Sequence, residues 1–147
     1  MKTIFDKSTR DELINRIHKL NENSKAEWGK MNVYQMLKHN TLWDEMMTGK
    51  KKYKQAFIGR LFGKMALKGV LKDEKPLRRN TPTVPEFRVT GNGDVLSEKT
   101  KWITQIEGYA HFSNPDFIHP FFGRMTREQI GQMAYKHADH HLRQFNC

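Results

Sequence analysis

Apolar residues recur every three or four positions along four stretches of the chain, which is the period of an α-helix with one buried face. The first stretch covers residues 8–20 and opens with Thr9 and Glu12, which have the spacing of a capping box. The second covers residues 33–47 and follows Asn32, a residue type that caps helix N-termini. Both stretches are therefore predicted to be amphipathic helices.

The second half of the chain repeats this pattern. The third stretch covers residues 97–112, and the fourth begins at Thr126, which forms a capping box with Gln129, and runs to the C-terminus. Between the second and third stretches, residues 55–71 predict a weaker, glycine-interrupted helix, and the prolines and glycines of residues 76–93 predict an extended connection. The pattern predicts an all-α fold, a four-helix bundle with a long crossover between its second and third helices.

Length and composition are those of one folded domain, residues 1–147, with 37% apolar residues. The only cysteine is Cys147, so the chain has neither an internal disulfide nor a CxxC metal site, which favours a reducing, cytoplasmic location. Residues 1–10 lack the apolar core of a signal peptide. No apolar run approaches the roughly 18 residues of a transmembrane helix.

The positive charge is concentrated in one segment. Residues 50–79 contain eleven basic and two acidic residues, a net charge of +9 out of +10 for the whole chain. Such a segment is usually a solvated face, but it also fits a nucleic acid, a membrane surface or an anionic substrate. No recognition helix or zinc finger accompanies it. The Met-rich, Gly-spaced stretch around Met65 could pack against a second copy of the chain or close its own core.

Two histidines on the last predicted helix carry most of the functional information. His137 and His141 are four residues apart, so both rings lie on one helix face and can point at one ion. That face is also apolar, and a buried histidine is often a hydrogen-bonded core residue. The spacing alone leaves both interpretations open. His140 is turned away from the pair, which predicts a position at a pocket rim or the surface.

Three motifs resemble those of the DinB/YfiT-like metal-binding bundle superfamily, and specifically of a small bacterial subgroup labelled as a domain of unknown function. The motifs are WGKMN at 28–32 leading into QMLKH at 35–39, HPFFG at 119–123 followed by Met125 and Thr126, and HADHHLRQF at 137–145. The resemblance implies that His39, from the edge of the second helix's apolar stripe, joins His137 and His141 to hold a divalent metal. His119 is expected to be a loop residue that docks on the bundle.

Such a site would leave the ion an open coordination position, as in catalytic rather than structural sites. Zn, Ni, Fe and Mn all accept imidazole, with Zn or Ni favoured here. Members that the sequence resembles include transferases that use small bacterial thiols, and a hydrolase would use the same ion on water. Trp43, Asn40 and Gln144 are candidates for the pocket wall or for supporting hydrogen bonds. Four carboxylates are possible bases but are expected at the surface: Asp44, Glu45, Glu107 and Asp139.

Overall fold

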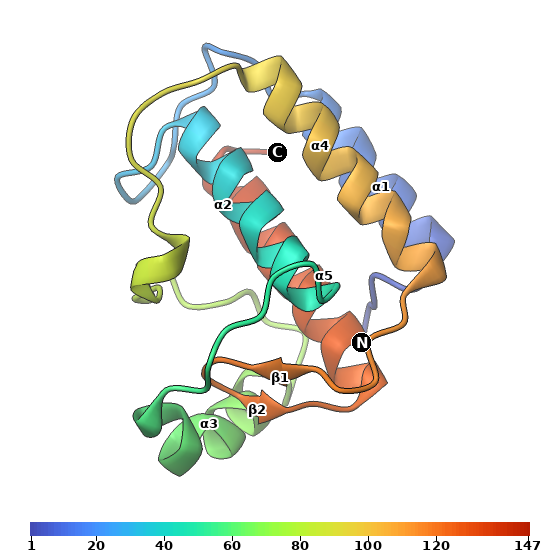
Figure 1. The fold of residues 1–147 in the computed structure, drawn as a ribbon. Helices are drawn as coiled ribbons and strands as arrows, with labels where there is room; N and C mark the ends of the chain where they lie inside the picture. The colour runs from blue at the N-terminus through green and yellow to red at the C-terminus, as the bar shows by residue number, and fades with distance from the viewer.

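A computed structural model describes residues 1–147 and shows a mostly helical chain, as the sequence pattern predicts (Figure 1). The longer helices are α1 (Lys7–His18), α2 (Val33–Met47), α3 (Phe57–Val70), α4 (Val95–Gly108) and α5 (Arg127–Gln144). Two 3₁₀ helices, η1 (Pro85–Phe87) and η2 (Tyr109–His111), and two antiparallel strands, β1 (Ile118–His119) and β2 (Gly123–Arg124), complete the chain. No helix is both long and apolar enough to cross a membrane.

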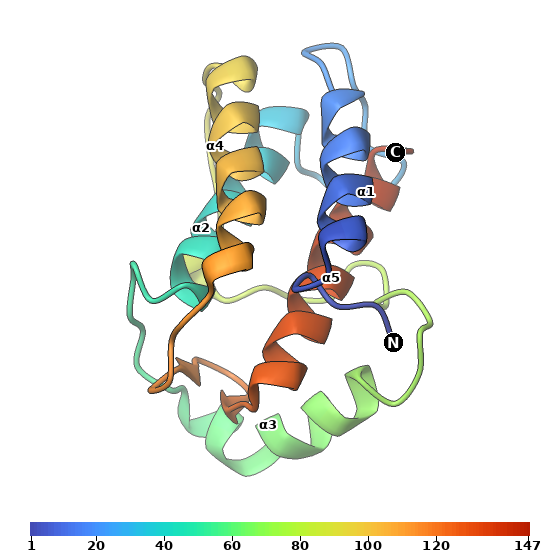
Figure 2. The ribbon, with the colours of Figure 1, turned by 90° about the vertical axis from the view of Figure 1, so that its right-hand side faces the viewer.

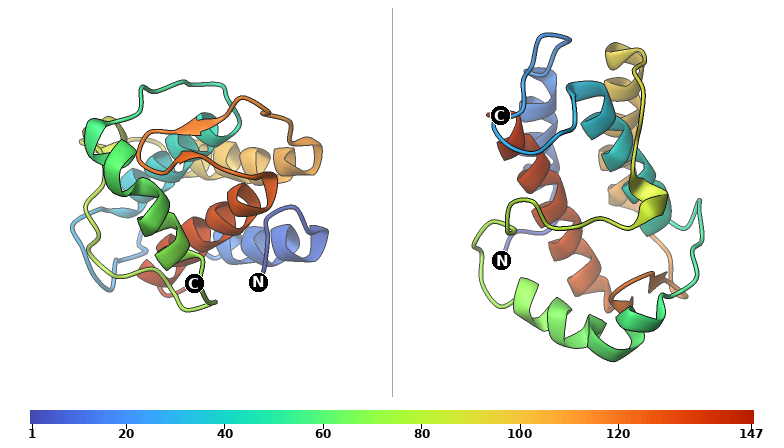
Figure 3. Two further views of the ribbon diagram at one scale, coloured as in Figure 1. Left: turned by 90° about the horizontal axis from the view of Figure 1, so that it is seen from below. Right: turned by 90° about the vertical axis from the view of Figure 1, so that its left-hand side faces the viewer.

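Four helices surround the hydrophobic core. Helix α4 packs against α1 and α2, and α5 packs against the other side of the same two helices. The core between them contains large, fully buried side chains, among them Trp102, Tyr109, Met36 and Leu13. Helix α3 runs across one end of these helices (Figure 2), and seen from below it lies beside the β1–β2 hairpin (Figure 3). The connection between α2 and α4 therefore carries a helix of its own.

Side-chain caps fix the start of the two helices that carry the histidines. Asn32 and Gln35 form both hydrogen bonds of a capping box before α2, and Thr126 and Gln129 do so before α5. These two predictions are confirmed. The capping box predicted at Thr9 is wrong, because α1 begins earlier, after Asp6, and Thr9 is buried within its first turns.

The bounds of α4 and the structure of the segment after it differ from those that the sequence pattern predicts. Helix α4 begins at Val95, where the Asp94 side chain accepts a hydrogen bond from Ser97 N, and its last turn narrows to the 3₁₀ helix η2. The hairpin of β1 and β2 was not predicted, since strands of two residues are too short to show an alternating pattern.

Two carboxylates expected at the surface are buried, and that prediction is wrong. Asp44 on α2 accepts hydrogen bonds from Trp102 Nε1 at 3.0 Å and from the Tyr109 hydroxyl at 2.7 Å. Asp139 on α5 pairs with Arg16 at 2.8 Å and Arg143 at 2.7 Å. Both carboxyl groups therefore have hydrogen-bond partners, and all of these partners except Arg143 come from other elements of the fold. Of the other two carboxylates, Glu45 is half-buried and Glu107 is exposed.

Helix α3 packs closely against the hairpin at two glycines. Gly59 and Gly63 lie directly on the backbone of Phe121, so a Cβ at either position would clash with the Phe121 carbonyl. At the other end of α3, the Lys136 ammonium of α5 donates to the carbonyl oxygens of Val70 and Asp73, each at 2.8 Å. Met65 is exposed, whereas Gly59, Gly63 and Leu67 of the same stretch are buried, so the stretch packs on the molecule through one face and leaves Met65 outside.

Candidate metal centre

The packing of α2 against α5 brings three histidines together. His39 comes from α2, while His137 and His141 lie one turn apart on α5, and all three side chains are buried. One ring nitrogen of each lies within 4.8 Å of those of the other two. His18 and His111 are exposed and do not belong to this cluster, and His140 lies next to it at the edge of a pocket.

Hydrogen bonds at Nδ1 determine which nitrogen of His39 and His141 is free. His39 Nδ1 lies 2.9 Å from the carbonyl oxygen of Phe87, which can only accept, so Nδ1 carries the proton. Gln144 donates through Nε2 to the Trp28 carbonyl at 2.8 Å, which turns its Oε1 toward His141 Nδ1 at 2.9 Å. Both histidines therefore keep an unprotonated Nε2, the form that binds a metal.

The spacing of the nitrogens suits one ion. His39 Nε2 lies 3.2 Å from His137 Nε2. Two nitrogen ligands of a tetrahedral zinc ion, at the usual bond length, stand about 3.3 Å apart. Trp43 stacks on the His137 ring with centroids 4.2 Å apart and an angle of 13° between the planes, which fixes the orientation of this ring. The donor set therefore fits a divalent transition metal.

The same surroundings keep the three imidazoles neutral. Burial lowers the pKa of His39, and it lowers the pKa of His137 and His141 well below the usual value. The neighbouring histidines lower these pKa values further, because protonation of one ring disfavours protonation of the next. At neutral pH all three rings are thus ready to accept a cation without first losing a proton.

The predicted supporting residues differ in what they contact. Gln144 holds His141 and Trp43 covers His137, as described above. Asn40 is buried, but its amide nitrogen donates to the Met36 carbonyl at 2.9 Å, on its own helix, and to none of the histidines. The Phe87 and Trp28 carbonyls were not found from the sequence, since a backbone oxygen leaves no signature in the side-chain pattern.

His119, on β1, lies near Trp43, and the centroids of the two rings are 6.4 Å apart. Its Nδ1 accepts hydrogen bonds from the backbone N–H groups of Phe121 and Phe122, so Nε2 carries the proton. Burial lowers the pKa of His119 to about 4, and Nε2 has no partner. His119 therefore presents a buried hydrogen-bond donor and no free lone pair for a metal.

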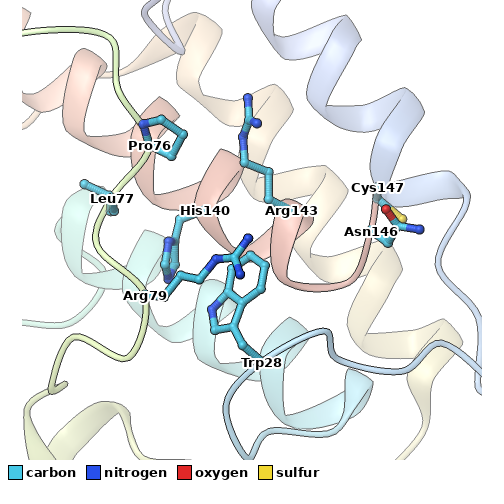
Figure 4. A pocket seen from close by; sticks show the side chains of 8 residues that line it. All are labelled: Trp28, Pro76, Leu77, Arg79, His140, Arg143, Asn146 and Cys147. Atoms are coloured by element: carbon cyan, nitrogen blue, oxygen red, sulfur yellow. The ribbon is translucent and has the colours of Figure 1, made fainter.

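A pocket of about 500 Å³ borders the cluster on the outer side of α5 (Figure 4). Arg79 lies over the Trp28 ring at 4.1 Å, and the His140 ring is 5.0 Å from that of His141. The lining has two arginines and no side-chain carboxylate, which suits an anionic small molecule: Trp28, Pro76, Leu77, Arg79, His140, Arg143, Asn146 and Cys147. Burial raises the pKa of the Cys147 thiol, so this residue is a poor nucleophile.

These features define the protein as a mostly helical one with three buried histidines that could hold a metal ion. The chain belongs to the family described as protein of unknown function (DUF1569), whose model matches residues 4–147. The match agrees with the expectation of a family of unknown function. Neither a curated protein nor a solved structure matches the chain.

Proposed function

We propose that the protein binds a divalent metal through His39, His137 and His141 and belongs to the DinB/YfiT-like four-helix bundle superfamily, with residues 1–147 as one such domain. The observation that carries the proposal is the convergence of three buried, neutral imidazoles, two of which have Nδ1 held by an acceptor. The packing of α1, α2, α4 and α5 around one core supports the bundle assignment.

Three neutral ligands would leave Zn²⁺ or Ni²⁺ its full charge and an open position, and such an ion lowers the pKa of a water or thiol bound to it. The residues around the cluster have separate tasks. Phe87 and Gln144 orient two of the rings, and Trp43 excludes water from the third. Arg79 and Arg143 would hold the anionic end of a substrate in the neighbouring pocket. We infer a metal-dependent enzyme of the small-thiol transferase type, with a hydrolase as the alternative.

The metal site is tested by elemental analysis of the purified protein and its variants. We expect about one divalent ion per chain, bound far more weakly by His137→Ala or His141→Ala. Gln144→Ala should weaken binding by roughly 10- to 100-fold, because it removes the hydrogen bond that orients His141 and leaves the three histidines in place. His140→Ala is the matched control on the same helix and should leave metal content unchanged.

A thermal-stability measurement separates a metal site from a buried polar core. Added metal should raise the melting temperature of the wild type but not of the His137→Ala variant, because only a ligand of the folded state stabilises through binding. Equal metal content in the wild type and both histidine variants, with no response of the melting temperature to metal, would contradict the proposal.

The reaction type is tested with the cobalt-substituted protein. A thiol substrate should add an intense sulfur-to-cobalt charge-transfer band to the spectrum and release a proton, because it binds as the thiolate. Arg79→Gln should weaken this response if the thiol carries an anionic group held in the pocket. If no low-molecular-weight thiol changes the spectrum, while a pH titration shows ionisation of bound water, the hydrolase takes the place of the transferase.

A further inference from the structure

Helix α3 exposes an unusual number of large apolar side chains. Five of its residues, which we call the apolar stripe, are between 51% and 73% exposed: Phe57, Ile58, Leu61, Phe62 and Met65. Only three other large apolar side chains are exposed in the whole molecule, and none of them lies on α3: Met1, Leu96 and Ile118. A continuous patch of this kind on a folded chain marks an interaction surface.

The apolar stripe points outward because the opposite face of α3 is the one that packs. Gly59, Gly63 and Leu67 form the buried face, and the two glycines lie on the Phe121 backbone. At 100° per residue, the stripe lies across the helix from these three residues. Rotation of α3 to bury the stripe would push large side chains into the Phe121 backbone. The packing of α3 on the hairpin therefore requires that the apolar stripe is exposed.

Cations run along one edge of the apolar stripe. Arg60, Lys64 and Lys68 follow one another at intervals of four residues, and all three are exposed, although Lys64 also donates to the Arg124 carbonyl. They belong to the segment 50–79, which carries a net charge of +9. An apolar face bordered by basic side chains is the pattern of a helix that lies in the interface of a membrane.

The charge decides between the possible occupants of this surface. A second copy of the chain would bring another +9 segment against the first, and the two would repel each other. A nucleic acid would satisfy the cations but would leave five apolar side chains facing phosphates and water. A bilayer with anionic lipids matches both parts, with acyl chains for the stripe and headgroups for the cations.

We propose that α3 docks the protein on anionic lipid bilayers, with the apolar stripe in the boundary of the acyl chains and Arg60, Lys64 and Lys68 at the headgroups. The helix lies across one end of the molecule, so it can rest along a flat surface without a clash with the four core helices (Figure 2, Figure 3). The proposal is independent of the metal site, to which α3 contributes no ligand.

The test is co-sedimentation with vesicles of phosphatidylcholine alone and of an equal mixture of phosphatidylcholine and phosphatidylserine. The wild type should bind the mixed vesicles and not the neutral ones. The double variant Leu61→Ser, Met65→Ser should lose more than about tenfold in affinity, because both exposed side chains would enter the acyl boundary. The variant Leu96→Ser is the matched control, since Leu96 is 67% exposed on α4, outside the stripe.

The charge requirement has its own pair of variants. Arg60→Gln with Lys68→Gln should weaken binding by about 30-fold, at roughly 1 kcal/mol per basic residue near an anionic surface. Lys25→Gln with Lys30→Gln removes the same charge from an exposed loop and should have little effect. The far-ultraviolet circular dichroism spectrum should stay unchanged in all of these variants, which checks that the fold is intact.

Four results would overturn the proposal. The first is failure of the wild type to bind the mixed vesicles at low salt, and the second is binding that survives the Leu61→Ser, Met65→Ser change. The third is a dimer in light scattering that this double variant splits, which would assign the apolar stripe to a second copy. Binding of duplex DNA that is lost in both pairs of α3 variants, without vesicle binding, would assign the surface to nucleic acid instead.

Discussion

The carboxyl group of Asp44 lies within the core, between α2 and α4, where it accepts hydrogen bonds from Trp102 and Tyr109. Burial raises the pKa of Asp44 to about 7, although the two donors and the charge of Lys50 act in the opposite direction. In the unfolded chain this pKa is near 3.8. The folded state therefore prefers the protonated carboxyl group, and its ionisation disfavours folding.

We expect Asp44→Asn to change how stability depends on pH. The contribution of Asp44 is fully present below its unfolded pKa and is lost as the pH rises through about 7, whereas asparagine stays neutral. The stability of the variant relative to the wild type should therefore rise between pH 4 and pH 8, by on the order of 4 kcal/mol. Urea unfolding across this range measures the difference, and two parallel pH profiles would show that Asp44 stays ionised.

Most of the residues missed by sequence reasoning have partners far away in the chain. Asp139 meets Arg16 across 123 residues and Asp44 meets Tyr109 across 65, so nothing near either carboxylate signals that it is buried. His137 and His141, in contrast, could be paired from their spacing alone. His39 lies 98 residues from His137, and only the resemblance to a known superfamily linked the two before the structure did.

At the scale of the elements, the contact between α3 and the hairpin depends on the absence of a side chain. A Cβ at Gly63 would meet the backbone of Phe121, which cannot move aside without shifting the hairpin. Gly69 lies on the same helix, but a Cβ there would meet no atom within 4 Å. A comparison of Gly63 with Gly69 therefore distinguishes the effect of close packing from the effect of the low helix propensity of glycine.

Gly63→Ala should destabilise the protein by about 1–3 kcal/mol, because the overpacking costs more than alanine gains in helix propensity. Gly69→Ala should stabilise it by up to about 1 kcal/mol, since it adds propensity without a clash. Thermal or urea unfolding of the two variants gives the comparison. Equal effects at both positions would mean that α3 does not rest on the hairpin as described.

The elements themselves were predicted with uneven success, for reasons that lie in their packing. Helices α2 and α5 have capping boxes and one-sided apolar patterns, so both their presence and their starts could be predicted. Helix α3 was predicted, but the direction of its apolar face was left open, because a helical period does not tell which side meets the core. The hairpin has strands of only two residues and packs against α3, a contact that its own sequence does not reveal.

Across the whole molecule, the charged segment and the histidine cluster occupy different regions. Helix α3 lies at one end, while the cluster lies between α2 and α5, where these helices pack (Figure 1, Figure 2). The sequence predicted both features but could not tell whether the cations served the metal site. Only Arg79, at the end of the basic segment, reaches the pocket beside the cluster.

Lys136 connects these two regions, since it immediately precedes His137 on α5 and its ammonium holds two carbonyl oxygens at the end of α3. If the end of α3 moved away, this ammonium would lose both acceptors, which opposes the movement. These hydrogen bonds, together with the close contact of Gly59 and Gly63 with the hairpin, hold α3 in one position relative to α5. If α3 rests on a surface, the distance between that surface and the histidine cluster is therefore fixed, and reactants would have to diffuse to the cluster.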